Sequence, residues 1–360
     1  MATMDTNSTR PNSPSPATDE HEIIFTSFGM FIIDEIHHLD GTSQYDVIGG
    51  AGTYAAYGAR YFLPYPLSKG VGWFVDAGSD FPQVIKEELF SLQTTMIFRE
   101  DQTRLTTRGW NSYGENEFRE FRYTTPKKRI VMEDVMSTKL VESRTFHVIC
   151  SPERAQDLIE GIVEQRKSTK KDLPLPVIAW EPVPDLCTPE HLDECLAVLP
   201  MVNILTPNAA EAAAFFGLPE PFEKESIEAI GIRFLPFMRE DAAIVIRAGS
   251  HGCLILSKGR EILWLEAYHT HFPDRVIDPT GAGNTFVGGL CTGYVLSNGD
   301  IIEASIYGNV AAGLSIEQVG LAKLTLPNDD GQPELWNGSE VMDRVKEYKA
   351  RIGLSRILSL

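Results

Sequence analysis

From residue 145 onward, short apolar runs alternate with segments whose apolar residues recur at helical spacing. The runs with the pattern of buried strands are residues 145–150, 175–181, 201–205 and 242–246, and the helical segments between them include residues 152–167 and 188–198. Strands separated by helices in this rhythm predict an α/β fold with a largely parallel, doubly wound sheet. Ligands of such sheets bind at the carboxyl ends of the strands, so polar and glycine-rich segments that follow strands are the candidate site residues.

The first apolar run, residues 23–34, breaks at Gly29 and ends in Asp34. A carboxylate at the end of a strand can bind the hydroxyls of a sugar or polyol, and it can equally be a solvated loop acid. Further along, Gly49 and Gly50 open a bend that leads into a helix of small residues. Glycines at such a bend permit either close approach of the backbone to a ligand or tight packing, and this signal by itself leaves both open.

The stretch that most directly indicates chemistry is residues 276–286. An apolar run ends in Asp278, a turn follows through Thr280, and two glycines bracket Ala282 before a helical pattern begins. Free N–H groups at a helix start, with the positive end of the helix dipole behind them, suit an anion, and glycines let the backbone approach it. Gly281, Ala282 and Gly283 therefore predict a site for a phosphate or a developing oxyanion, with a tight packing turn as the alternative.

Two further segments follow predicted strands. Asn208 opens a helix with a polar cap, and Glu211 places an acid in the first turn of that helix. Gly249 and Gly252 belong to a predicted hairpin between two apolar runs. Residues 94–125 are rich in Thr, Arg and aromatics with patches of alternation, a pattern that suits a lid or a small sheet rather than core.

Composition divides the chain into three parts. Residues 1–22, rich in Ser, Thr, Pro and Asn, predict a disordered tail because they offer too little apolar surface to bury. Residues 23–325 are expected to form the domain, with lid segments at about 35–46 and 94–125. Residues 326–360 predict a C-terminal extension that ends in an amphipathic helix.

The formal net charge of -18 argues against binding to nucleic acids or acidic membranes, since both need basic patches. The 5 cysteines are scattered without CxxC spacing, a pattern typical of reduced thiols rather than of a disulfide framework or a zinc site. No apolar run has the length of a membrane span, and the N-terminus lacks the hydrophobic core of a signal peptide. We therefore expect a soluble, cytoplasmic protein, with a nuclear location left open.

These motifs, in this order, resemble the PfkB family of carbohydrate kinases, which have the ribokinase-like fold. The resemblance extends from about residue 23 to about residue 321. Four segments carry it: residues 278–284 match the family's D-T-x-G-A-G-D signature, 49–52 its di-glycine signature, 208–211 its N-x-x-E motif, and 249–252 its GxxG turn near the nucleotide. The G-A-G-N sequence combined with a GGxGT-type bend is similar to a fungal branch of the family.

The resemblance implies that ATP and Mg²⁺ are used to phosphorylate a hydroxyl of a small sugar-like or nucleoside-like metabolite, over an anion hole formed by the G-A-G turn. The residues implied to bind the acceptor are Asp34, Gly49, Gly50 and Tyr54. Those implied to bind the nucleotide are Asn208, Glu211, Gly249, Gly252, Thr280 and Asn309. By the same resemblance, Glu211 would hold Mg²⁺ through water, Asp278 would belong to a monovalent-cation site, and a homodimer through the lid is an expectation by analogy.

The departures from the family pattern affect the chemistry directly. The family signature ends in an aspartate that takes the proton from the acceptor hydroxyl, and this chain has Asn284, whose amide cannot act as a base. Loss of a general base costs a factor of about 10²–10⁴ in rate. Tyr54 replaces an asparagine that faces the sugar, and Glu181 begins an altered strand end. Two interpretations therefore remain: a kinase whose proton goes elsewhere, or a catalytically weak relative that binds nucleotide or metabolite as a sensor or scaffold.

Overall fold

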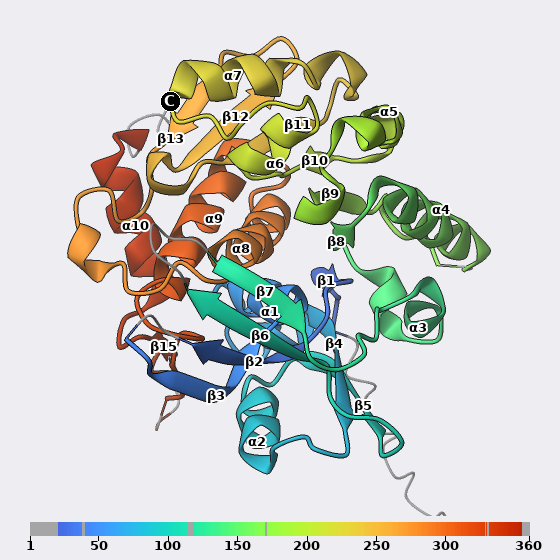
Figure 1. The fold of residues 1–360 in the computed structure, drawn as a ribbon, viewed down its shortest axis with the longest axis vertical. Coiled ribbons are helices and arrows are strands. Elements are labelled where there is room, and N and C mark those ends of the chain that lie inside the picture. Colours follow the sequence, from blue (N-terminus) through green and yellow to red (C-terminus); the bar gives the residue numbers. More distant parts are fainter. Residues whose placement is uncertain are drawn as a thin grey trace, which may run out of the picture.

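The computed structural model describes residues 21–37, 40–113, 119–169, 171–327, 329 and 331–354, so residues 1–20 of the predicted tail lie outside the described residues. A nine-stranded sheet runs through the centre of the molecule (Figure 1). Its strands, in spatial order, are β13 (Leu263–Leu265), β12 (Cys253–Ser257), β11 (Ala243–Arg247), β10 (Ile204–Leu205), β9 (Val177–Pro182), β8 (Thr145–Cys150), β1 (Phe25–Ser27), β4 (Val71–Gly78) and β5 (Thr95–Asp101). This arrangement confirms the predicted α/β architecture.

The strands from β11 to β5 all pair in parallel, and only the β13 edge is antiparallel. The direction reverses after β11 because a short turn at Gly249–His251 leads straight back into β12. A turn of this length can join only antiparallel neighbours, whereas each parallel pair needs a longer crossover.

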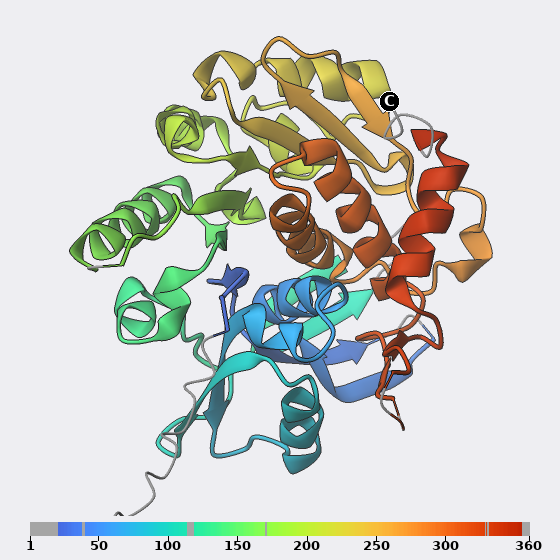
Figure 2. The same cartoon turned by 180° about the vertical axis from the view of Figure 1, so that it is seen from behind.

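Helices cover both faces of the main sheet (Figures 1 and 2). On one face lie α1 (Ala51–Arg60), α8 (Ala282–Leu296), α9 (Ile301–Ser315) and α10 (Val341–Arg351), together with α2 (Gln83–Ser91) near the β5 edge. On the other face lie α3 (Met132–Met136), α4 (Pro152–Ser168), α5 (Leu192–Val198), α6 (Ala209–Ala214) and α7 (Lys224–Ile232). Each face has its own apolar core.

A second, four-stranded sheet lies beside the first. Its strands, in order, are β3 (Ser43–Gly49), β2 (Ile32–His37), β6 (Arg108–Tyr113) and β7 (Arg119–Tyr123). One part of the predicted lid differs from expectation: β5, within residues 94–125, pairs in parallel with β4 as the edge of the main sheet. The crossover from β4 through α2 brings this strand back to the main sheet, and within residues 94–125 only the part from Arg108 onward joins the small sheet.

Small residues bring α1 and α8 into close contact. A Cβ atom on Gly58 would lie 2.1 Å from the carbonyl oxygen of Thr285, and one on Gly288 would lie 1.9 Å from that of Ala55. α1 follows directly after β3 of the small sheet, and α8 follows the turn at Gly281. This contact therefore fixes the distance between the small sheet and that turn.

The predicted C-terminal amphipathic helix is α10, which packs Val341, Val345 and Tyr348 into the core and contacts α9. Before it, two short strands, β14 (Leu324–Thr325) and β15 (Leu335–Trp336), pair in an antiparallel ribbon. All five cysteines are buried and free. Within the described ranges, no helix combines the length and apolar character that crossing a membrane requires.

Candidate active site

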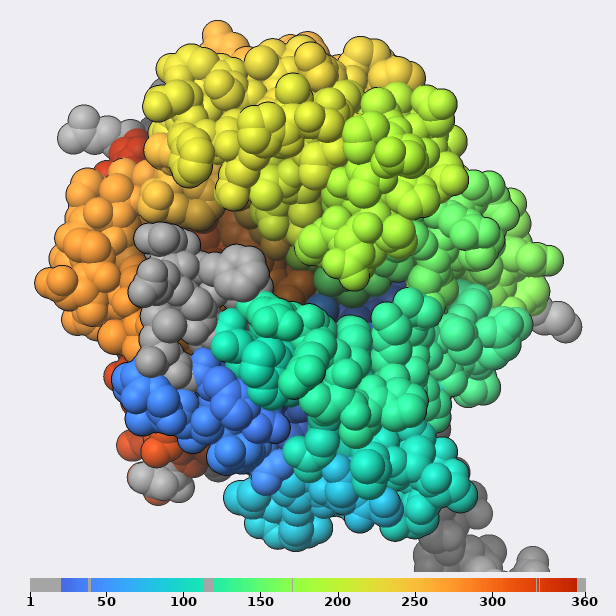
Figure 3. Space-filling model, viewed as in Figure 1, coloured from blue at the N-terminus to red at the C-terminus, as the bar shows by residue number. Residues whose placement is uncertain are grey.

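The segments singled out in the sequence meet where β9, β10 and β11 end and α8 begins. Figure 3 shows the face on which this region opens: a hollow lies between the teal surface of the small sheet and the yellow-green surface around α6. Gly281 precedes α8 in the left-handed conformation, with φ of 77°, a conformation that favours glycine. The N–H of Ala282 donates to the carbonyl oxygen of Pro279 at 3.2 Å. The N–H groups of Gly283 and Asn284 have no partner within the helix, as at any helix start.

Two large side chains, Tyr54 and Arg247, pack against the Gly281–Gly283 turn. A Cβ atom on Gly281 would lie 2.2 Å from the ring of Tyr54, and one on Gly283 would lie 2.0 Å from Nη1 of Arg247. Close approach favours glycine at both positions, and at Gly281 the left-handed backbone conformation favours it as well. Because a guanidinium lies directly against the turn, an anion bound there would be near a full positive charge in addition to the helix start.

Arg247 is held by acidic and carbonyl groups at the ends of neighbouring strands. Its Nη2 lies 2.9 Å from Oε1 of Glu181 and donates to the carbonyl oxygen of Thr206 at 3.1 Å. The same nitrogen lies 3.3 Å from Oε2 of Glu211. Its Nε is buried and has no hydrogen-bond partner among the residues that the structure describes. Sequence reasoning missed this role, because Arg247 directly follows the predicted strand 242–246 and its partners lie far away in the chain.

Glu181 is the most enclosed carboxylate of the site, with 4% of its surface exposed. Its Oε2 lies 2.9 Å from Nε2 of His147 and accepts a hydrogen bond from Nδ2 of Asn284 at 2.9 Å. Burial alone would raise the pKa of Glu181, but the charge of Arg247 and these hydrogen bonds hold the pKa below its usual value. Glu181 is therefore a buried anion whose oxygens are all engaged.

His147 is fully buried in the middle of the sheet, and sequence reasoning treated it only as a strand residue. Its Nδ1 lies 3.0 Å from Oγ of Ser27, which accepts a hydrogen bond from the N–H of Gly29 at 3.0 Å. Because the ionised Glu181 can only accept, Nε2 of His147 carries the hydrogen that faces it, and in the neutral imidazole Nδ1 then accepts from the hydroxyl of Ser27. The neighbouring strands β1, β8 and β9 thus supply one continuous buried hydrogen-bonded chain.

Asn208 and Glu211 form the predicted helix start. Oδ1 of Asn208 accepts from the N–H of Glu211 at 2.7 Å, and Oε2 of Glu211 accepts from the N–H of Asn208 at 2.8 Å. Burial raises the pKa of Glu211 to about 7; the charge of Arg247 lowers it and that of Glu181 raises it. The local capping motif therefore also places a carboxyl group with a nearly neutral pKa beside Arg247.

The predicted acceptor residues lie on the small sheet. Asp34, on β2, is 6% exposed, and its carboxylate fills the space above Gly49: a Cβ atom there would lie 1.9 Å from Oδ2. On the opposite side, a Cβ atom on Gly109 would lie 2.5 Å from Oδ1. Gly50, with φ of 94°, lies against the backbone of Met30. Glycines on both neighbouring strands thus make room for one carboxylate.

The remaining residues predicted to bind the nucleotide or a cation lie outside the group around Arg247. Thr280 donates its N–H to Oδ1 of Asp278 at 2.9 Å, and the N–H groups of residues 277 and 278 share the carbonyl oxygen of Ile316. Gly252, with φ of 87°, lies against the backbone after β13. The amide of Asn309 is buried and donates to Tyr348 at 3.0 Å and to the sulfur of Cys253 at 3.5 Å, so α10 covers it. The structure does not bring Asn309 to the turn.

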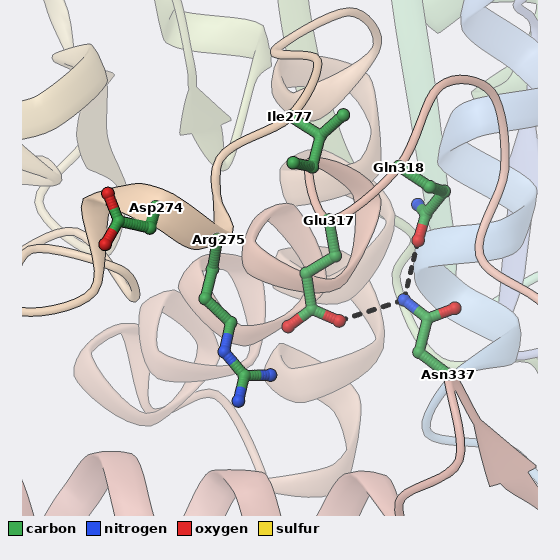
Figure 4. A pocket seen from close by; sticks show the side chains of 6 residues that line it. All are labelled: Asp274, Arg275, Ile277, Glu317, Gln318 and Asn337. Atoms are coloured by element: carbon green, nitrogen blue, oxygen red, sulfur yellow. Dashed lines mark hydrogen bonds between the residues drawn. The ribbon is translucent and has the colours of Figure 1, made fainter.

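A cavity of about 570 Å³ lies between the segment that holds Asp274 to Ile277 and the side chains of Glu317 and Asn337 (Figure 4). Its lining residues are Asp274, Arg275, Ile277, Glu317, Gln318 and Asn337, none of which belongs to the group around Arg247. Nδ2 of Asn337 donates to Glu317 at 2.9 Å and to Gln318 at 2.7 Å. Although burial raises it, hydrogen bonds from His269, Arg344 and Asn337 hold the pKa of Glu317 down at about 2. The cavity wall is therefore charged, and its Glu317 carboxylate is already hydrogen-bonded to neighbouring side chains.

For a divalent cation, the described residues offer Glu211 and carbonyl oxygens rather than a cage of several carboxylates. The Glu211 carboxylate already bonds a backbone N–H and contacts Arg247, so it fits a contact through water better than direct ligation. Mg²⁺ commonly keeps several waters and binds mainly through phosphate oxygens. For a monovalent cation, the candidate ligands are the oxygens of Asp278 and Ile316, both of which already accept hydrogen bonds from backbone N–H groups.

Comparisons with known proteins agree with this arrangement. Residues 95–329 match the model of the pfkB family carbohydrate kinases. Protein MAK32 of Saccharomyces cerevisiae is 39% identical over 94% of this chain and 95% of its own length. An uncharacterized protein of Schizosaccharomyces pombe is 37% identical over 91% of this chain and 93% of its own. Both of these relatives are fungal.

Solved structures share the fold at much lower identity. A ribokinase from Giardia lamblia matches with a TM-score of 0.67 and 17% identity, covering 92% of this chain and 99% of its own. A putative ribokinase II from E. coli, solved in complex with ATP and Mg²⁺, matches with a TM-score of 0.63 and 18% identity, over 92% and 99%. The predicted ribokinase-like fold is thereby confirmed.

Proposed function

Because the chain belongs to the PfkB family of carbohydrate kinases, we propose that it transfers the terminal phosphoryl group of ATP to a hydroxyl of a small sugar-like or nucleoside-like metabolite. The observation that carries this proposal is the Gly281–Gly283 turn at the start of α8, with the guanidinium of Arg247 packed against it. Phosphoryl transfer depends mainly on positioning and on neutralising charge. A helix start and a buried cation can supply both.

The proposal divides the site between the two sheets. On the small-sheet side, the acceptor is bound by Asp34, Gly49 and Gly50, with Tyr54 beneath the turn. On the main-sheet side, the residues proposed to bind the nucleotide are Asn208, Glu211, Gly249, Gly252 and Thr280. The role of Asn309 near the base stays a prediction, and its burial under α10 does not favour it.

In the proposed step, the acceptor oxygen bonds to the terminal phosphorus while the bond from that phosphorus to the bridging oxygen breaks, and ADP leaves with the electron pair. The hydroxyl proton passes to an oxygen of the transferred phosphoryl group, because the amide of Asn284 cannot take it up. Such a route is compatible with a loose transition state, in which bonding to the acceptor is weak. Glu211 would hold Mg²⁺ through water, and the bound cation would neutralise phosphate charge.

A second candidate is a catalytically weak or inactive relative that binds nucleotide or metabolite as a sensor or scaffold. The observation that favours it is Asn284, which donates a hydrogen bond where a base would accept one. The phosphate side would remain under both candidates, since neither the turn nor Arg247 depends on the identity of residue 284. A monovalent cation beside Asp278, a homodimer through the small sheet and a cytoplasmic location also remain proposals.

The test measures phosphoryl transfer from Mg²⁺-ATP to a panel of sugars, nucleosides and polyols, together with binding of a fluorescent ATP analogue. Gly281→Ala should lower turnover by about 100-fold or more, because it displaces the anion-binding N–H groups. Gly259→Ala is the matched control: Gly259 also has positive φ, 68°, but lies in an exposed turn with no neighbour within 4 Å. Binding without turnover on any acceptor would favour the second candidate, and absence of both would contradict both candidates.

A further inference from the structure

The side-chain amide of Asn284 donates a hydrogen bond to the carboxylate of Glu181. Its Nδ2 lies 2.9 Å from Oε2 of Glu181, a carboxylate whose pKa is held low and which therefore only accepts hydrogen bonds at neutral pH. The amide end that faces Glu181 must then be the NH₂ group, so the orientation of this amide is fixed by charge. Its oxygen is directed away from Glu181, and Asn284 is only half-buried, in the first turn of α8 beside the Gly281–Gly283 turn.

We propose that Glu181 and Asn284 act as one unit, in which Glu181 carries the negative charge of this part of the site and orients the Asn284 amide so that its oxygen accepts a hydrogen bond from the acceptor hydroxyl. Glu181 is then a positioning residue and Asn284 the residue that contacts the substrate. This inference rests on the proposed function for the substrate contact, whereas the charge relation between the two residues does not depend on it.

The surroundings of Glu181 explain why residue 284 is neutral. The charged and titratable groups that face the pair are His147 from β8, Arg247 from β11 and Glu211 from α6, with the Cys291 thiol on α8 nearby. Arg247 is already shared between Glu181 and Glu211. A carboxylate at residue 284 would place a further negative charge within hydrogen-bond distance of Glu181 without an additional cation. Two carboxylates so close repel each other, and the repulsion is relieved when the pair binds a proton.

Under this proposal, Asn284→Asp lowers both stability and turnover, although it restores the aspartate of the family signature. The folded variant should bind one extra proton, shared by the two carboxyl groups. The folded-state pKa of this pair is then raised, so stability is retained at low pH and lost as pH rises. The melting temperature of Asn284→Asp should therefore fall increasingly below that of the wild type between pH 5 and pH 8.

The experiment compares wild type, Asn284→Asp, Glu181→Gln and the double variant Glu181→Gln/Asn284→Asp. The double variant restores one carboxylate and one amide with their positions exchanged, so its pH-dependent loss of melting temperature should disappear. Each single variant should lose about 100-fold in kcat, the size of effect expected from misplacing a reacting group, with the KM for ATP little changed. The double variant should recover most of that kcat.

Asn298→Asp provides the matched control, because it makes the same change at an exposed position just after α8. It should leave both the pH dependence and kcat unaltered. An Asn284→Asp variant with the pH dependence of the wild type and equal or higher turnover would overturn the proposal. A wild type without turnover, combined with the expected pH dependence, would confirm the charge pair but remove its catalytic role together with the proposed function.

Discussion

Two buried carboxyl groups share the single guanidinium of Arg247, and they do not share it equally. Glu181 has the shorter contact, 2.9 Å, and additional donors in His147 and Asn284. Glu211 has the longer contact, 3.3 Å, and feels the charge of Glu181. Consequently the pKa of Glu181 lies below its usual value and that of Glu211 above it, a separation typical of groups with different roles.

The raised pKa of Glu211 predicts how stability depends on pH. Because the folded-state pKa, about 7, exceeds the value of 4.5 expected when unfolded, the stabilising effect is complete below pH 4.5 and is lost as pH rises through 7. Relative to Glu211→Gln, the wild type should therefore lose about 2.5 kcal/mol in unfolding free energy between pH 5 and pH 8. Urea unfolding across this range measures the difference.

Glu225→Gln serves as the control for that series, since Glu225 is an exposed acid in the first turn of the neighbouring helix α7. The unfolding free energy of Glu225→Gln should differ little from that of the wild type, and the difference should not change with pH. If the Glu211→Gln difference were equally flat, Glu211 would not titrate near neutral pH in the folded protein, and its assignment as a nearly neutral partner of Arg247 would be wrong.

At the scale of elements, one buried hydroxyl on α10 contacts both α9 and the segment after β13, in addition to the apolar packing and ion pairs of this helix. Tyr348 is fully buried, donates to the carbonyl oxygen of Glu266 and accepts from Asn309 at 3.0 Å. Asn309 in turn reaches Cys253 on β12. The C-terminal helix, α9 and the antiparallel edge of the main sheet thus share one polar contact, and a ligand would reach Asn309 only after α10 moved.

Tyr348→Phe should therefore destabilise the fold although the ring is retained. The change leaves a buried amide and a buried carbonyl without their shared partner, which costs about 1–3 kcal/mol. Thermal or urea unfolding measures the loss. Tyr45→Phe, at a tyrosine that is 65% exposed, should have almost no effect, and equal effects of the two changes would contradict a structural role for the Tyr348 hydroxyl.

At the scale of the whole molecule, the two sheets contribute different halves of the site. Asp34 belongs to β2 of the small sheet, whereas Glu181 and Arg247 belong to the main sheet. The close packing of α1 on α8 at Gly58 and Gly288 holds these halves at a defined separation. Substitutions in one half should therefore affect one ligand and spare the other.

Asp34→Asn tests this separation. Loss of a charged hydrogen-bonding partner should raise the KM for the acceptor about 10- to 100-fold, while the affinity for an ATP analogue stays unchanged. Asp40→Asn, at an exposed acid in the loop between β2 and β3, is the control and should alter neither. A parallel loss of nucleotide affinity in Asp34→Asn would show that the two halves are not independent.

The sequence predicted those features that depend on local patterns. Alternating apolar runs and helices indicated the parallel sheet, and the glycines at residues 281 and 283 indicated a turn with close backbone approach. The assignment of β5 to the lid was wrong because a pattern of strand residues does not tell which sheet the strand joins. Arg247 and His147 were missed for a related reason: each is one polar residue in an apolar strand, and its partners come from other strands.

The complete burial of the five cysteines makes local opening of this molecule measurable without any substitution. Burial raises the pKa of Cys253 to about 12 and raises that of Cys291 as well, so neither thiol reacts while its surroundings stay closed. Cys253 lies beneath the contact of α10 with α9, and Cys291 lies within α8. The rates at which a thiol reagent modifies them would report separately how often the C-terminal helix lifts and how often α8 is exposed.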